Sequence, residues 1–169
     1  MKWTEGHVHL AMRHILKDHG WLLVAGEFPG GSDHDLYPLN VVDPALAKDD
    51  SPDPRRHSLG EQIPDLVALR DRDLFIGEAK LRYDAGDREK LITLVSDRRE
   101  HLLMALRAFA RDRRVPELLP VETLCLRPAL VFLSDSQVPG RPAGDLSYLR
   151  IVGRNEGFFE GALQHALKC

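Results

Sequence analysis

The stretch IPDLVALRDRDLFIGEAK, residues 63–80, decides the fold and the chemistry expected of this chain. Two apolar runs flank the polar residues 71–73, and this arrangement predicts a β-hairpin. Because strand side chains alternate between faces, we expect Glu78 and Lys80 to point the same way. Asp65 then falls opposite roughly Glu78 on the neighbouring strand. The stretch therefore predicts two carboxylates and one ammonium on a common face.

The rest of the chain predicts helices around this hairpin. Residues 28–62 are rich in Pro and Gly and are expected to form a long loop, of a kind that is usually functional or mobile, with 39–42 as a possible short strand. The expected elements are a helix starting at Thr4 and stopping at Gly20, strands at 21–26, 63–70, 74–81, 129–134 and 146–152, one long helix over 87–113 with Asp87 as its N-cap, and a final helix over 156–167. This order predicts an α/β fold with a mixed central sheet flanked by helices.

Composition narrows the class of protein. The 169 residues suit one domain spanning 1–169, and 43% hydrophobic with 29% charged residues is typical of a globular protein. Neither a membrane span nor a signal peptide is visible, so we expect a cytoplasmic protein without a membrane partner. The two cysteines lack CxxC spacing, which argues against a zinc ribbon. No Walker-type phosphate loop occurs, so no nucleotide cofactor is expected.

The paired acids of the hairpin suit a hard divalent cation. Mg²⁺ prefers oxygen ligands and is commonly held by one or two carboxylates together with water and phosphate oxygens. Asp65 and Glu78 would supply the carboxylates, and the backbone carbonyl of Ala79 could supply a third ligand. Lys80 would then lie close to the metal-bound water, where it could orient or deprotonate that water or stabilise developing charge.

These motifs resemble the PD-(D/E)xK nuclease superfamily, also called restriction-endonuclease-like. The resemblance rests on Pro64-Asp65, a twelve-residue gap and Glu78-Ala79-Lys80, with apolar residues around each motif. It implies a restriction-endonuclease-like αβββαβ core over about residues 1–134. It also implies that the two acids bind Mg²⁺, which Mn²⁺ can replace, and that the lysine assists phosphodiester hydrolysis.

Members of this superfamily often carry a metal-facing glutamate on the first helix, and Glu5 is the matching candidate. Glu5 lies on the line of the apolar face, at its N-terminal edge. The other interpretation is that Glu5 complements the helix dipole as a first-turn acid. Glu27 is the fallback carboxylate.

Nucleic-acid contacts must come from local basic residues, because the net charge is −3. The candidates are Arg55 and Arg56 in the long loop, Arg82 after the motif strand, and Lys90 and Arg98 on the long helix. Each could hold a phosphate, or could belong to an ordinary solvated surface. For Arg98 the second interpretation is a stem that covers the core while its charge reaches water.

The leading function is a Mg²⁺-dependent endonuclease that hydrolyses DNA phosphodiester bonds in a restriction or other defence setting. One alternative is a Holliday-junction resolvase or repair nuclease, and another is a catalytically silent, nuclease-like module that binds nucleic acid. Because one chain holds one site, cutting both strands would require a homodimer or a place in a larger defence or repair complex.

Overall fold

The computed structural model describes residues 2–26 and 64–166, with side chains up to residue 164. The long loop, the possible strand at 39–42, Glu27, Arg55 and Arg56 therefore lie outside the described residues. The elements are α1 (Glu5–Asp18), β1 (Leu22–Gly26), β2 (Leu66–Arg70), β3 (Asp73–Ala79), α2 (Ala85–Val95), α3 (Arg99–Asp112), the short 3₁₀ turns η2 (Pro116–Leu118) and η3 (Val121–Thr123), β4 (Cys125–Leu133), β5 (Ser147–Gly153), β6 (Glu156–Gly161) and α4 (Ala162–Ala166).

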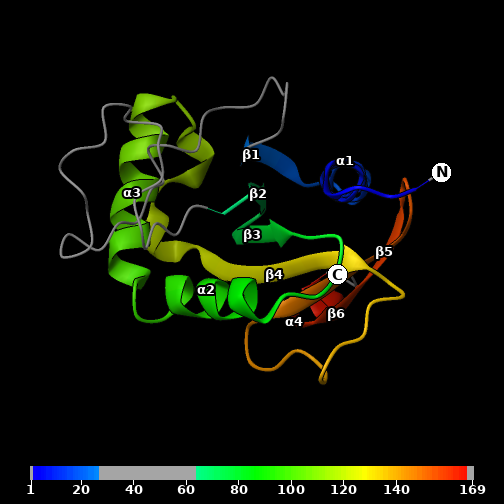
Figure 1. The fold of residues 1–169 in the computed structure, drawn as a ribbon. Coiled ribbons are helices and arrows are strands. Elements are labelled where there is room, and N and C mark those ends of the chain that lie inside the picture. The colour runs from blue at the N-terminus through cyan, green and yellow to red at the C-terminus, as the bar shows by residue number, and fades with distance from the viewer. Residues whose placement is uncertain (1, 27–63, 167–169) are drawn as a thin grey trace, which may run out of the picture.

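The strands form one six-stranded sheet in the order β1-β2-β3-β4-β5-β6. Neighbours pair antiparallel from β1 to β3, parallel from β3 to β5, and antiparallel again at β5 and β6. The parallel step from β3 to β4 is bridged by α2 and α3, as a crossover connection requires (Figure 1). The expected α/β class with a mixed sheet is confirmed.

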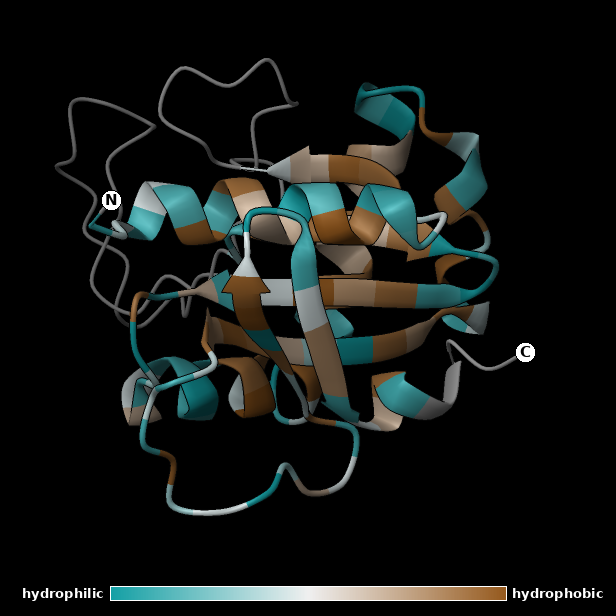
Figure 2. Ribbon diagram, turned by 90° about the vertical axis from the view of Figure 1, so that its right-hand side faces the viewer, coloured by the Kyte–Doolittle hydropathy of each residue, from teal (hydrophilic) through white to brown (hydrophobic). Residues whose placement is uncertain are grey.

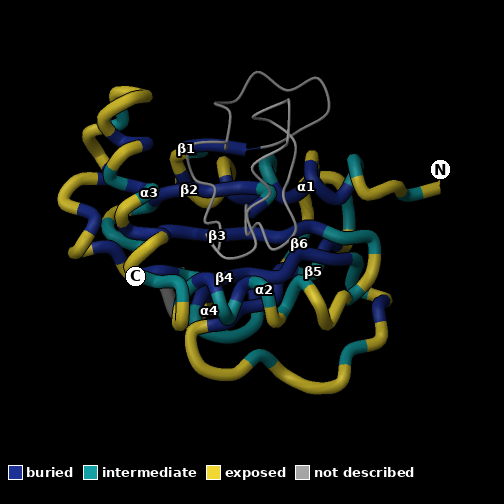
Figure 3. Tube along the Cα trace, turned by 60° about the vertical axis from the view of Figure 1, so that its left-hand side comes forward, coloured by how far each residue is buried: buried dark blue, intermediate teal, exposed yellow. Residues whose placement is uncertain are grey.

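Helices cover both faces of this sheet, and each face has its own apolar cluster. Val8, Met12 and Leu16 of α1 pack with Phe75 and Ala79 of β3. On the other face, α2 and α3 contribute Leu91, Leu94, Leu102, Leu106 and Phe109 against Leu74 and Ile76. The central strands are buried between the helices, whose hydrophilic sides face outward (Figures 2 and 3). None of the helices described within 2–26 and 64–166 has the length and apolarity needed to cross a membrane.

The hairpin of β2 and β3 forms as its sequence predicts. Arg70 pairs with Asp73 and Leu66 with Gly77, so only Asp71 and Arg72 make the turn. Alternation is also confirmed, because Phe75 and Ala79 join the α1 face whereas Ile76 joins the α2 face. The hairpin therefore fixes the direction in which the side chains of its motif residues leave the sheet.

The prediction of a single long helix over 87–113 is wrong, because residues 96–98 separate two helices, α2 and α3. The Ser96 hydroxyl donates to the Ile92 carbonyl (2.8 Å) at the end of α2, and Arg98 has the non-helical angles φ −103° and ψ 10°. Asp87 is not the N-cap either. Asp84 occupies that position, and its carboxylate accepts a hydrogen bond from the Asp87 N–H (2.8 Å).

The final helix expected over 156–167 is also wrong for most of its length. Residues Glu156–Gly161 form β6, and only Ala162–Ala166 are helical. Gly157 permits this strand, because a Cβ there would lie 2.8 Å from the Arg150 carbonyl oxygen of β5. Gly161 ends the strand with φ +90°, a conformation that favours glycine.

Candidate active site

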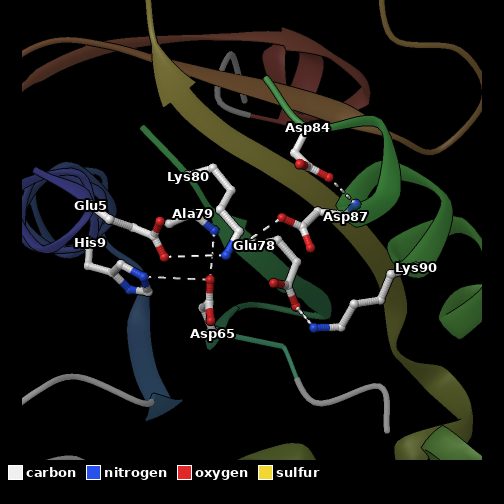
Figure 4. A network of polar contacts seen from close by, with 9 residues as sticks. All are labelled: Glu5, His9, Asp65, Glu78, Ala79, Lys80, Asp84, Asp87 and Lys90. Carbon is white, nitrogen blue, oxygen red and sulfur yellow. Dashed lines mark hydrogen bonds and ion pairs between the residues drawn. The ribbon is translucent and has the colours of Figure 1, made fainter. Parts of the chain in front are cut away.

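Polar side chains from four elements meet beside the C-terminal end of β3. Asp65 precedes β2, Glu78 and Lys80 lie at the end of β3, and Glu5 and Asp87 come from the first turns of α1 and α2. Figure 4 shows that these side chains point toward one another. Residues far apart along the chain thus converge on the position that the hairpin motif predicts.

Asp65 is tied to the strand that carries Glu78. Its backbone N–H donates to the Gly77 carbonyl (2.9 Å), which continues the β2–β3 ladder by one residue. Its Oδ2 accepts a hydrogen bond from the Ala79 N–H (2.8 Å) and lies 3.6 Å from Nε2 of His9, a buried residue of α1. These contacts hold the carboxylate in place from both the strand and the helix.

Glu78 is almost fully buried, with 2% of its surface exposed. Its Oε1 lies 2.6 Å from Nζ of Lys90 on α2. Burial, reinforced by the charge of Asp65, raises the pKa of the Glu78 carboxyl to about 8, although Lys90 acts in the opposite direction. Such a perturbed carboxyl in a polar pocket is typical of a functional site.

Lys80 bridges the two sides of the pocket. Its Nζ lies 3.3 Å from Glu5 Oε1 and 3.8 Å from Asp87 Oδ2. Burial acts to lower the pKa of Lys80, but the negative charges of Asp87 and Glu5 outweigh this effect and raise it. The side chain is therefore an ammonium near neutral pH.

Asp87 is the acid that the sequence did not assign to the site. Burial raises the pKa of its carboxyl, and Lys80 opposes that shift. Its Oδ2 is buried and accepts no hydrogen bond from the residues that the structure describes. The cation that faces this oxygen is the Lys80 ammonium, 3.8 Å away.

The oxygen donors of the pocket suit Mg²⁺. Asp65 and Glu78 are contributed by adjacent strands, and Asp87 approaches from α2. Within the described part of the chain, no group of three His, Cys, Asp or Glu side chains is arranged closely enough to enclose a metal ion. Mg²⁺ does not need such a cage, because it keeps several waters and commonly takes only one or two protein carboxylates.

The other predicted residues divide between this pocket and more distant positions. Lys90 reaches the pocket through Glu78, and Glu5 does so through Lys80, while also being a first-turn acid of α1. The Ala79 N–H contacts Asp65. Arg82 instead pairs with Asp135 outside the pocket. Arg98 follows the opposite end of α2, an 11-residue helix that is roughly 16 Å long.

Two members of the pocket carried weak signals in the sequence. His9 follows Glu5 by four residues, so both lie on one face of α1. Asp87 precedes Lys90 by three residues, which places both on one face of α2. These spacings indicate a shared site only once the N-terminal ends of α1 and α2 are known to lie beside the hairpin.

Comparisons of the chain with family models, with curated proteins and with solved structures yield no significant match.

Proposed function

We propose that this protein is a Mg²⁺-dependent nuclease that hydrolyses DNA phosphodiester bonds. The observation that carries the proposal is the convergence of Asp65, Glu78 and Lys80 on one pocket beside the end of β3. An unrelated α/β domain would have no evident reason to bury Glu78 beside other acids, since burying carboxylates together is costly.

The order of elements supports a restriction-endonuclease-like core. The chain runs α1, β1, β2, β3, then α2 and α3, then β4, which agrees with the αβββαβ order that the motif resemblance implies. The strands β5 and β6 and the short α4 extend the sheet beyond that core. In this interpretation the acids lie at the end of the sheet where the two motif strands present them.

Asp65 and Glu78 are the residues that would hold Mg²⁺. The bound ion would supply Lewis-acid stabilisation of the phosphate and a water of lowered pKa. Asp65 is already oriented by the Ala79 N–H (2.8 Å). His9, 3.6 Å away, limits where that carboxylate can move.

Lys80 contributes positive charge. In the metal-free protein its pKa is raised by Asp87 and Glu5, so it is an ammonium at neutral pH. An ammonium in this place can donate hydrogen bonds to the attacking water and to the non-bridging phosphate oxygens, where negative charge grows as water attacks phosphorus. Glu5 and Asp87 hold the ammonium between the two helices, so both act as positioning residues for Lys80.

The proposal is tested by incubating the protein with supercoiled plasmid, linear duplex, branched DNA and single-stranded RNA, each with Mg²⁺ and with chelator. We expect Mg²⁺-dependent cleavage of DNA. Discrete fragments would indicate a restriction-type enzyme, whereas cleavage of branched DNA alone would indicate a junction resolvase. Binding of DNA without cleavage under any metal condition would contradict the nuclease proposal and favour a silent binding module.

A further inference from the structure

A hollow lies close to the candidate active site along the chain. It has a volume of about 360 Å³ and is lined by Arg82, Tyr83, Asp135, Ser136 and Gln137. Arg82 is two residues beyond Lys80, a span of at most about 7 Å of chain. The parallel ends of β3 and β4 stay paired up to this point, since the Lys80 N–H donates to the Val131 carbonyl (2.9 Å) and the Leu133 N–H to the Leu81 carbonyl (3.5 Å).

The floor of the hollow is held firmly. The Tyr83 N–H donates to the hydroxyl of buried Ser136 (2.8 Å), and the Ser136 N–H donates to the Leu133 carbonyl (3.0 Å). The Tyr83 ring packs edge-on against Phe132 and Tyr148, with centroids 5.9 and 6.1 Å away. The segments that carry Arg82 and Asp135 are therefore fixed to one another before any ligand binds.

The rim of the hollow carries an exposed ion pair between Arg82 and Asp135, whose side chains are 55% and 68% exposed. An exposed pair of this kind contributes little to stability. Its chemistry also disfavours a phosphate, because the Asp135 carboxylate would repel the anion that Arg82 attracts. The pair suits a neutral ligand that offers hydrogen-bond acceptors and donors side by side.

We propose that this hollow reads a G·C base pair in the major groove next to the scissile phosphate, an inference that rests on the proposed nuclease function. In that groove guanine presents the acceptors N7 and O6, which match the donors of Arg82. Cytosine presents its N4 amino group, which can donate a hydrogen bond to the Asp135 carboxylate. Gln137, on the same rim, carries both a donor and an acceptor. The ion pair between Arg82 and Asp135 thus orients both side chains for base contacts before DNA binds.

The test is to sequence the ends produced from duplexes randomised around the cleaved bond. We expect the wild-type protein to favour G·C at one fixed distance from the cut. Arg82→Ala and Asp135→Ala should each reduce this preference at least fivefold, given roughly 1–3 kcal/mol for a good base contact. Arg107→Ala on α3, which breaks a comparable exposed pair with Glu122 of η3, is the matched control and should leave the preference unchanged.

A second arm replaces guanine by 7-deazaguanine at the preferred position, which removes the N7 acceptor. Cleavage by the wild-type protein should fall, and cleavage by Arg82→Ala should not fall further. Cleavage without any base preference, or a preference that survives in Arg82→Ala, would overturn the inference while leaving the nuclease proposal intact. Failure of the wild-type protein to cut any DNA, duplex or branched, would overturn the nuclease proposal itself, and this inference with it.

Discussion

Lys90 Nζ lies 2.6 Å from Glu78 Oε1, so α2 supplies a counter-charge to the most deeply buried acid of the pocket. The other ammonium, Lys80, lies between Glu5 and Asp87. The acids of the pocket are thus partly neutralised from within the protein. A divalent cation that binds Glu78 must compete with the ammonium of Lys90.

Replacement of Lys90 should strengthen metal binding once Glu78 is ionised. In Lys90→Met no ammonium competes for the carboxylate, and the repulsion between two cations is lost. Because Lys90 lowers the pKa of Glu78, the substitution also raises that pKa above about 8, so the affinity for Mg²⁺ is measured by calorimetry at a series of rising pH values. We expect Lys90→Met to bind at least about threefold more tightly at the pH where the affinity of each protein stops rising. A weaker affinity at this pH would show that Lys90 supports the metal site instead of competing with the ion.

The stability of the metal-free protein should fall as the pH rises. The pKa of Glu78 is raised in the folded protein from 4.5 to about 8. Below pH 4.5 the Glu78 carboxyl is protonated in both the folded and the unfolded chain. Between pH 4.5 and about 8 it ionises only in the unfolded chain, and this ionisation favours the unfolded state. The free energy of unfolding, measured with urea in chelator, should decline by on the order of a few kcal/mol across this range.

In Glu78→Gln the free energy of unfolding should depend less on pH, and at pH 8 it should exceed that of the wild-type protein. Glu89→Gln changes an exposed acid on α2 and serves as the control. Parallel pH curves for the wild-type protein and Glu78→Gln would contradict the raised pKa.

Asp65→Asn should weaken Mg²⁺ binding without unfolding the protein. The asparagine carbonyl can still accept the hydrogen bond from the Ala79 N–H (2.8 Å in the wild-type protein), but it carries no charge for the cation. We expect calorimetry to show about a tenfold or greater loss of affinity. Asp145→Asn, an exposed acid outside the pocket, should bind Mg²⁺ as the wild-type protein does. Equal affinities for Asp65→Asn and Asp145→Asn would count against ligation by Asp65.

Gly77→Ala should destabilise the hairpin that presents the site. A Cβ at Gly77 would lie 2.9 Å from Cζ of Phe75 and 3.3 Å from Sδ of Met12, both of them fully buried. We expect a loss of roughly 1–3 kcal/mol in chemical denaturation. Gly140→Ala has no atom within 4 Å of the added Cβ and is the control. An unchanged midpoint for Gly77→Ala would mean that Phe75 can move aside.

The hairpin and its acids could be predicted from sequence because their signals are local. Strand alternation and a short turn near Arg72 suffice to place Asp65 roughly opposite Glu78, and the observed pairing of Leu66 with Gly77 agrees with that expectation. The position of Lys80 between two helices could not be predicted in this way. It depends on where α1 and α2 begin relative to the sheet, which is a property of the tertiary structure.

The broken helix illustrates what periodicity misses. Leu91 and Leu102 are both buried on the same sheet face, and their eleven-residue separation is about three helical turns. The apolar pattern therefore keeps its phase across the break at residues 96–98, where neither Gly nor Pro marks the change. At the C-terminus, Phe159 and Leu163 are four residues apart and fit a helical stripe. Pairing with β5 selects the strand for Glu156–Gly161.

The most direct test of the account compares the Mg²⁺-dependent cleavage of supercoiled plasmid by the wild-type protein and by Lys80→Met. This substitution keeps the length and apolar stem of the side chain but removes the ammonium that Glu5 and Asp87 hold in the pocket. We predict cleavage by the wild-type protein that chelator abolishes, and a rate for Lys80→Met that is at least about a hundredfold lower with an unchanged fold by circular dichroism. Equal rates for the two proteins would contradict the proposed role of this pocket.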